Sequence, residues 1–370
     1  MHPRLSATYH IHSDARAIET RAQALAVEQS VEMPLAAIDD PFVRTEIVGR
    51  VEAIAPKENG KFEVRIALAS ETVGDDPGQL LNMLFGNSSL HDDVTLYDVE
   101  LPSSLEQCFG GPRHGLHGLR RRAGASARAL TCAPLKPQGL SPRRLADLAR
   151  RYALGRIDFI KDDHGLADQA YAPFEVRVAT IAEALRKIDS RSASARYVPS
   201  LSGDLETMRR QIATASAVGL DTVMVAPMIA GLSNFHRLVR EHPQIAFVAH
   251  PGMAGAARIA PALLLGKLFR MLGADAVIFP NYGGRFGYTP DICRALAREA
   301  VARREHLEPC MPVPAGGMHA GRVAEMLDFY GAEAMLLIGG ALLEAGARLI
   351  EATAAFVEQV HRHSYVADEG

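Results

Sequence analysis

The side chains most able to do chemistry stand at the end of one apolar run, GRIDFIKDDH (residues 155–164). The run has the character of a buried strand. Because side chains alternate across a strand, Lys161 and Asp163 should share one face. A lysine and a carboxylate in this arrangement can serve catalysis or bind a metal ion, although a buried structural ion pair is the plain alternative. Asp162 has the opposite parity, so we expect a structural role for it.

Further polar or glycine-rich positions follow other apolar runs. Paired glycines let backbone N–H groups approach an anion closely, because no Cβ blocks them. Two such pairs after consecutive apolar runs predict a phosphate cradle, with ordinary turns as the alternative. The positions are Lys136, His250 with Pro251, Arg285 within NYGGRF (281–286), Gly316 with Gly317, and Gly339 with Gly340.

The elements that must position these residues repeat regularly after residue 128. Helical patterns alternate with apolar strands, and Ser141-Pro142 and Thr289-Pro290 have the types of helix N-caps and first residues. Eight strand–helix units over about 240 residues predict a (β/α)8 TIM barrel, whose function lies at the C-terminal ends of its strands. The strands should end near Leu135, Asp163, Leu201, Pro227, His250, Pro280, Ala315 and Ile338.

The first part of the chain predicts a smaller module. Strands are expected at 5–13, within 45–70 on both sides of an Asn59-Gly60 turn, and at 94–101, with helices at 15–30 and 77–85. The order βαββαβ is that of a ferredoxin-like domain. We therefore predict an α/β protein in which an N-terminal ferredoxin-like α+β domain, residues 1–120, precedes a TIM-barrel catalytic domain, residues 121–370.

Composition argues against several classes of partner. The formal net charge of −3 gives no reason to expect nucleic acid or an anionic membrane surface. No leader pattern and no bilayer-length apolar run is present, which favours a cytoplasmic protein. The cysteines lack CxxC spacing, so we expect buried free thiols rather than zinc ligands or disulfides at Cys108, Cys132, Cys293 and Cys310.

Four strings in the predicted barrel carry a family resemblance. LKPQGLSP (135–142), GRIDFIKDDHGLADQ (155–169), AGGMH (315–319) and IGG (338–340) resemble the large subunit of RuBisCO. They resemble more closely the RuBisCO-like proteins, its non-carboxylating form IV relatives. GGPRHG (110–115) and VEQS (27–30) add support, and the match is collinear over nearly the whole chain.

The resemblance implies a metal site. It identifies Lys161 as the lysine that reacts with CO2 to form a carbamate, and Asp163 as the metal ligand beside it. Two hard oxygen ligands suit Mg2+. His164 stands where carboxylating members have a second acidic ligand. It is the third candidate ligand, although a neutral imidazole suits Mg2+ poorly and a supporting or acid–base role is open.

The resemblance also implies catalytic and binding roles. Lys136 would handle protons during enolisation, and His250 would lie near the substrate unless it is a hydrogen-bonded core histidine. Glu28 would reach into the site of a neighbouring subunit, which implies a homodimer or a multiple of dimers. Arg285 would clamp phosphate, unless it is a plain surface arginine, beside the backbone of Gly316, Gly317, Gly339 and Gly340.

Departures from the RuBisCO pattern limit the reaction. Pro251 replaces an arginine that grips a second phosphate, and Ile278 replaces a histidine on the same side. Arg285 stands where carboxylation needs a lysine, and Met33-Pro34 replaces an expected Thr-Trp pair. The loss of these groups argues against a bisphosphate substrate and against CO2 fixation.

The predicted function is therefore Mg2+-dependent enolisation of a phosphorylated keto sugar or sugar acid, with an isomerase, decarboxylase or C–C hydrolase outcome. Relatives are linked to methylthio-sugar phosphates and to branched sugar acids, and the motifs do not choose between them. Two alternatives stay open. One is a metal-free, aldolase-type barrel that forms a Schiff base on Lys161 or Lys136. The other is a non-catalytic sensor of a sugar phosphate.

Overall fold

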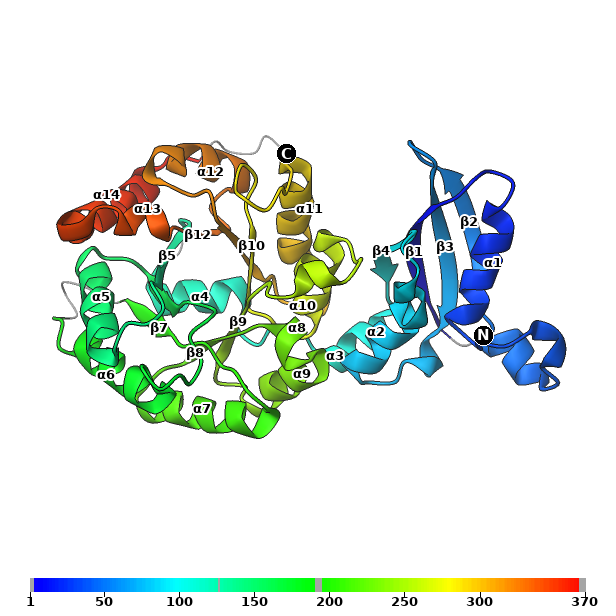
Figure 1. Cartoon of the computed structure of the whole chain (residues 1–370), viewed down its shortest axis with the longest axis horizontal. Helices are drawn as coiled ribbons and strands as arrows, with labels where there is room; N and C mark the ends of the chain where they lie inside the picture. Colours follow the sequence, from blue (N-terminus) through cyan, green and yellow to red (C-terminus); the bar gives the residue numbers. More distant parts are fainter. Residues whose placement is uncertain (1–2, 126, 190–194, 366–370) are drawn as a thin grey trace.

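The small N-terminal sheet has the predicted ferredoxin-like order. A computed structural model describes residues 3–125, 127–189 and 195–365 of the chain. An antiparallel sheet of order β2-β3-β1-β4 is joined to two helices at one end of the molecule (Figure 1). Its elements are β1 (Arg4–His12), α1 (Ile18–Glu28), β2 (Arg50–Pro56), β3 (Lys61–Ala69), α2 (Pro77–Phe85) and β4 (Val94–Glu100).

Alternation explains why the central strand forms where it does. Leu5, Ala7, Tyr9 and Ile11 of β1 are fully buried, whereas the residues between them are partly exposed on the other face of the sheet. The hairpin between β2 and β3 turns at Asn59 and Gly60, with φ values of 59° and 69°. Positive φ at both positions is what a type I′ hairpin turn requires, as the sequence predicted.

The rest of the chain forms the predicted barrel. Its eight parallel strands have the order β7-β6-β5-β12-β11-β10-β9-β8, and a bridge between Ser200 and Met224 links the two ends of this order. Figure 1 shows the helices as an outer ring around these strands. The strands are β5 (Leu130–Leu135), β6 (Phe159–Asp162), β7 (Arg196–Val198), β8 (Thr222–Val225), β9 (Ala246–Ala249), β10 (Ala276–Pro280), β11 (Met311–Ala315) and β12 (Met335–Leu337).

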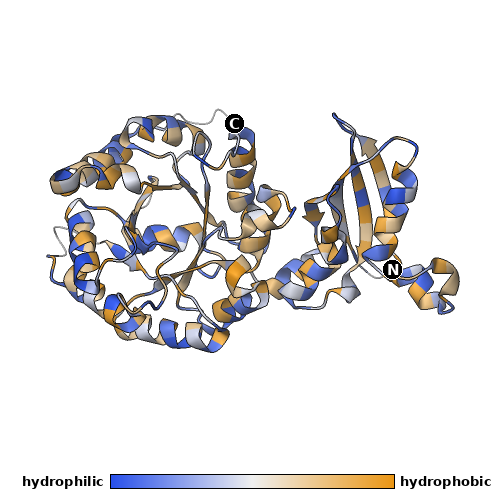
Figure 2. Cartoon of the chain, viewed as in Figure 1, coloured by the Kyte–Doolittle hydropathy of each residue, from blue (hydrophilic) through white to orange (hydrophobic). Residues whose placement is uncertain are grey.

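The helices of the ring bury one face against the strands, as amphipathic helices do. Figure 2 shows hydrophobic and hydrophilic positions alternating along them. The helices that follow β4 in the chain are α3 (Ser103–Phe109), α4 (Gly115–Ala123), α5 (Pro142–Leu154), α6 (Phe174–Arg186), α7 (Leu205–Ala217), α8 (Pro227–Ala230), α9 (Leu232–Glu241), α10 (Phe269–Met271), α11 (Pro290–Val301), α12 (Val323–Tyr330), α13 (Gly340–Leu343) and α14 (Leu349–Arg362). Of these, α4 lies inside the ring in Figure 1 and contacts β9 and β11.

The GGPRHG segment joins the two parts of the chain through a buried carboxylate. Asp275 accepts hydrogen bonds from the backbone N–H groups of His114 at 2.7 Å, Gly115 at 2.6 Å and Phe247 at 2.8 Å. A second link joins β4 to the barrel, where Lys267 pairs with Asp98 at 2.8 Å. The domain boundary at residues 120 and 121 falls within α4 and stays a prediction.

The cysteines follow the expectation with one exception. Cys132, Cys293 and Cys310 are buried free thiols, but Cys108 is exposed, so the prediction of burial was wrong there. Cys108 lies on the solvent side of the short helix α3, whose buried residues are Leu105 and Phe109. Within the described residues, no helix is long and apolar enough to cross a membrane.

Candidate active site

A cavity of about 1090 Å³ opens at the C-terminal ends of the barrel strands. Its wall comes from the ends of β5, β6, β9, β10, β11 and β12 and from the loops that follow them. The structure therefore brings together all but one of the predicted site residues. Those that line the cavity are Lys136, Lys161, Asp163, His164, His250, Arg285, Gly316, Gly317, Gly339 and Gly340.

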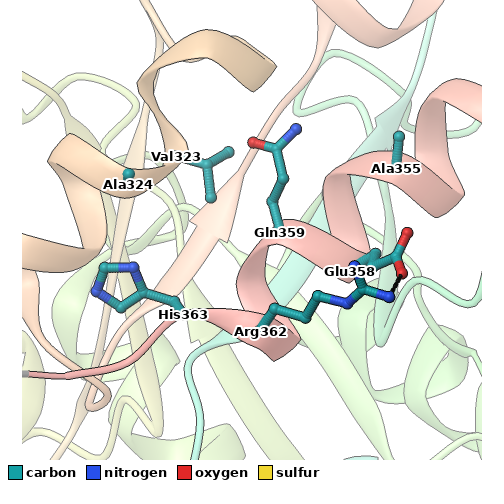
Figure 3. A pocket seen from close by; sticks show the side chains of 7 residues that line it. All are labelled: Val323, Ala324, Ala355, Glu358, Gln359, Arg362 and His363. Atoms are coloured by element: carbon teal, nitrogen blue, oxygen red, sulfur yellow. Dashed lines mark ion pairs between the residues drawn. The ribbon is translucent and has the colours of Figure 1, made fainter.

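A second hollow lies on the outside of the helical ring. Figure 3 shows it between α12, which carries Val323 and Ala324, and α14, which carries Glu358 and Arg362. The volume of this groove is about 430 Å³. The predicted site residues are not among those that line it. The candidate site is therefore the cavity at the barrel mouth.

Lys161 is the last-but-one residue of β6 and is only 5% exposed. Its Nζ donates a hydrogen bond to the backbone oxygen of Asp162 at 2.9 Å. Burial lowers the pKa of Lys161, and the positive charge of Lys136 acts in the same direction. A lysine whose ammonium form is disfavoured offers more of the neutral amine, the form that attacks CO2 or a carbonyl carbon.

Asp163 holds its carboxylate among cationic and N–H donors. It forms an ion pair with Lys136. Its Oδ1 lies 2.8 Å from Nδ1 of His164 and accepts the N–H of Gly165 at 3.3 Å. Burial alone would raise the pKa of Asp163, but the hydrogen bonds from His164 and Lys136 outweigh it and lower that pKa. Asp163 is therefore an anion at the edge of the cavity.

His250 is held as a neutral ring. Its Nδ1 accepts the backbone N–H of Gly252 at 3.0 Å, so the proton of the neutral imidazole resides on Nε2. Burial lowers the pKa of His250 to about 3, with the charges of Lys161 and His164 adding to the effect. The ring can thus donate a hydrogen bond to a substrate oxygen, and it is a weak base.

Asp162 points away from the cavity, as its parity predicted. Its carboxylate accepts hydrogen bonds from the Tyr197 hydroxyl at 2.7 Å, the Ser200 N–H at 3.1 Å and Nε of Arg177 at 3.2 Å. Asp162 and Arg177 are both fully buried. This ion pair anchors the end of β6 behind the site and so fixes the direction in which Lys161 and Asp163 point.

The glycine pairs leave open space beside the chain. A Cβ built on Gly316 or Gly340 would have no neighbour within 4 Å, so a ligand could approach the backbone there. A Cβ on Gly317 would lie 2.8 Å from Cα of Gly284, which shows that the loops after β10 and β11 touch. Backbone N–H groups on such open loops can cradle an anion.

Sequence reasoning missed a residue that ties these loops together. Nη1 of Arg322 donates to the backbone oxygens of Tyr282 at 3.3 Å and Gly317 at 3.2 Å, while its other nitrogens pair with Glu325. Arg322 therefore fixes the glycine loop after β11 against the loop after β10. The string AGGMH ends three positions before Arg322. The role of this arginine depends on the contact between the two loops, which the sequence alone does not show.

Two apolar residues at the cavity rim were also missed. Met253 and Phe286 line the cavity and are 61% and 57% exposed. The guanidinium of Arg285 lies 4.9 Å from the centre of the Phe286 ring. Arg285 itself lines the cavity, and its predicted role as a phosphate clamp stays a prediction.

Glu28 is the predicted site residue that the cavity of its own chain does not include. It ends α1 in the small domain, where its carboxylate accepts a hydrogen bond from Asn87 at 3.0 Å. The predicted reach of Glu28 into a partner subunit stays a prediction.

Binding of a divalent cation in the cavity would depend on the ligand atoms that its side chains offer. In the described segments, no group of three or more His, Cys, Asp or Glu side chains is placed to hold a metal ion. Asp163 supplies a carboxylate, but an unmodified Lys161 supplies no anionic oxygen. A carbamate on Lys161 would add two. The residues present therefore fit Mg2+ when Lys161 is carbamylated.

Comparisons with known proteins agree with this geometry. Residues 115–355 match the family described as ribulose bisphosphate carboxylase large chain, catalytic domain. The chain is 58% identical to the 5-methylthioribulose-1-phosphate isomerase of Rhodospirillum rubrum, over 97% of each chain. It is 32% identical to the 2,3-diketo-5-methylthiopentyl-1-phosphate enolase of Geobacillus kaustophilus, over 79% of this chain and 73% of that one.

A solved structure is similar along almost the whole length. The RuBisCO-like protein of Rhodopseudomonas palustris superposes with a TM-score of 0.93 at 52% identity, covering 99% of this chain and 100% of that one. The octameric RuBisCO of Pyrococcus horikoshii superposes with a TM-score of 0.90 at 21% identity, covering 97% of this chain and 87% of that one, which shows the shared fold.

Proposed function

The chain belongs to the RuBisCO large-chain family, among its non-carboxylating RuBisCO-like members, and from that premise we propose that it isomerises a 5-methylthioketopentose phosphate through an enediolate. The relative named as an isomerase of 5-methylthioribulose 1-phosphate is 58% identical, against 32% for a relative named as an enolase. The isomerase outcome is therefore the one we favour among those that the sequence left open.

The substrate itself dictates which proton must move. 5-Methylthioribulose 1-phosphate has its carbonyl at carbon 2, between the phosphate-bearing carbon 1 and the hydroxyl-bearing carbon 3. A base takes the proton from carbon 3, and the electrons of that bond form a double bond to carbon 2. The carbon-2 oxygen, left as an enolate, takes up a proton and becomes a hydroxyl. Return of a second proton to carbon 2, with loss of the hydroxyl proton at carbon 3, leaves the carbonyl at carbon 3.

Different residues of the cavity could carry out the separate steps of this reaction. Lys161, as its neutral amine or its carbamate, would take the proton, and Lys136 would return one. His250, through Nε2–H, would donate a hydrogen bond to the oxygen on which charge develops. The glycine loops after β11 and β12 would hold the phosphate and so fix the distance from carbon 3 to the base.

A divalent cation has a place in this scheme. Carbamylated Lys161 and Asp163 would hold Mg2+, with His164 as a further candidate ligand. When bound, the ion supplies positive charge that stabilises an enediolate.

One observation carries the proposal: a buried lysine of lowered pKa and a carboxylate share one cavity with two open glycine loops. The test is to incubate the purified protein, with Mg2+ and bicarbonate, with 5-methylthioribulose 1-phosphate and follow the carbon signals by NMR. We expect the carbonyl to migrate. Unchanged substrate would contradict the proposal, and binding without any change would favour the sensor alternative. Conversion of the diketo compound alone would assign the chain to the enolases.

A further inference from the structure

The mouth of the cavity carries exposed apolar side chains from the short helix α8 and from two adjacent loops. Ile229, Met253 and Phe286 are 66%, 61% and 57% exposed, and they follow β8, β9 and β10. Met253 and Phe286 line the cavity. Ile229 packs against the same rim, because a Cβ on Gly252 would lie 3.2 Å from its Cδ1. Large apolar residues that remain exposed together at a ligand cavity point to a binding surface.

The backbone at Met253 is held in an uncommon conformation. Its φ of 64° lies in the left-handed region, where residues other than glycine, asparagine and aspartate are rarely found. Such local strain concentrates at functional positions. The side chain that the strained loop presents is an unbranched thioether, which adapts its shape to an apolar ligand.

The order of the strands places glycine-rich, ionic and apolar residues on different parts of the cavity wall. The glycine loops follow β11 and β12, and the ionic residues Lys136, Lys161 and Asp163 lie at the C-terminal ends of β5 and β6. In the eight-stranded ring, β8 lies four positions from β12 and is therefore opposite to it. The apolar rim begins at that opposite position and extends through the loops after β9 and β10. Deeper in the same wall, Ile278 is 3% exposed and presents no charge.

We propose that Met253 and Phe286, backed by Ile229, form the subsite that receives the methylthio group of the substrate. The inference rests on the proposed function and adds the residues that select this substrate. With the phosphate on the glycine loops and carbons 2 and 3 beside Lys161, the thioether end of the molecule faces the apolar rim. The subsite favours a methylthio group over a hydrogen at the same carbon through apolar burial.

Ligands that cannot react allow binding at this subsite to be measured independently of the isomerisation. The measurement compares the Kd of 5-methylthioribitol 1-phosphate with that of 5-deoxyribitol 1-phosphate by calorimetry, on the whole chain with Mg2+ and bicarbonate. The two probes differ by one apolar substituent, so we expect the wild type to bind the thioether about tenfold more tightly. Because both probes carry the same phosphate, a change at the phosphate cradle cancels in the ratio.

Substitutions then assign the preference to residues. Met253→Ala and Phe286→Ala should bring the ratio of the two Kd values towards one, whereas Met253→Leu should retain most of it. Val176→Ala, at a 53% exposed position of α6 outside the cavity lining, is the matched control and should leave the ratio unchanged. Thermal unfolding of each variant shows whether the fold is retained.

The outcomes distinguish the two proposals. A wild-type ratio near one, or a tenfold ratio that survives both alanine variants, overturns the apolar subsite even if the isomerase is active. An intact ratio that depends on Met253 and Phe286, in a protein that leaves 5-methylthioribulose 1-phosphate unchanged, supports the subsite and overturns the isomerase proposal. If neither probe binds, both proposals fail.

Discussion

The imidazole rings of His164 and His250 stack face to face, with centroids 4.6 Å apart and planes inclined by 9°. One ring follows β6 and the other follows β9, so the contact crosses the mouth of the barrel. His164 also lies 2.8 Å from the carboxylate of Asp163. The stack therefore joins the ionic side of the cavity to the neutral hydrogen-bond donor His250.

Substitution of Asp162 should lower the stability of the fold, whereas substitution of Asp163 should lower activity. Asp162→Asn leaves the fully buried Arg177 without its counter-ion, so we expect the free energy of unfolding to fall by about 3 kcal/mol. Asp163→Asn removes a carboxylate at the cavity edge and should abolish isomerisation while changing stability much less. Urea unfolding and NMR turnover assays measure the two effects. The opposite pattern would show that Asp163 is the structural residue.

Removal of divalent cations should inactivate the enzyme. Treatment with EDTA followed by desalting is expected to stop turnover, and Mg2+ with bicarbonate should restore it, because in the proposed scheme a carbamate on Lys161 and Asp163 would together hold the cation. Mg2+ added in CO2-free buffer should restore less activity than Mg2+ with bicarbonate. Full activity in the continued presence of chelator would contradict the metal-dependent scheme.

Borohydride tests the metal-free alternative. If Lys161 acted through a Schiff base, reduction in the presence of substrate would attach the substrate covalently to the lysine. We expect no mass increase of the protein after borohydride treatment with 5-methylthioribulose 1-phosphate. An adduct located on Lys161 or Lys136 by peptide mass spectrometry would favour the aldolase-type mechanism instead.

The neutral state of His250 should appear in the pH dependence of stability. The pKa of His250 is lowered from 6.5 to about 3, so between these values the unfolded chain binds a proton that the folded chain does not. This group therefore makes the fold less stable as the pH falls through that window. Relative to His250→Gln, the wild type should lose up to about 1.4 kcal/mol more per pH unit.

Urea unfolding of the metal-free protein at several pH values from 6.5 downwards measures this difference. His117→Gln, at an exposed position of α4 and outside the cavity lining, is the matched control for losing a histidine. Parallel curves for the wild type and His250→Gln would show that His250 titrates normally in the folded protein.

The sequence predicted the parts of the site that depend on local pattern. Strand alternation placed Lys161 and Asp163 on the side of the cavity and Asp162 on the other, because each side chain's direction follows from its parity along β6. Strand ends also placed the glycine loops, since all parallel strands of a barrel present their carboxyl ends at one mouth. The Asn59-Gly60 turn could be predicted for the same reason, because its conformation depends on the turn residues themselves.

Contacts between distant segments could not be predicted in this way. The stack of His164 on His250 depends on how loops after β6 and β9 cross the barrel mouth. The position of Arg322 between two loops, and the left-handed backbone of Met253, likewise depend on the packed structure. The exposure of Cys108 was missed for a related reason, because the face that α3 turns to the solvent is set by its neighbours.

The most direct test of the central claim is proton exchange at carbon 3 of the substrate. In deuterium oxide with Mg2+ and bicarbonate, the wild type should exchange the carbon-3 proton of 5-methylthioribulose 1-phosphate during turnover, as read by NMR. Lys161→Met should lose this exchange by a factor of roughly a thousand or more, whereas Lys187→Met, at a position where the side chain is 73% exposed, should retain it. Exchange at the wild-type rate in Lys161→Met would contradict the claim that Lys161 takes the proton from carbon 3.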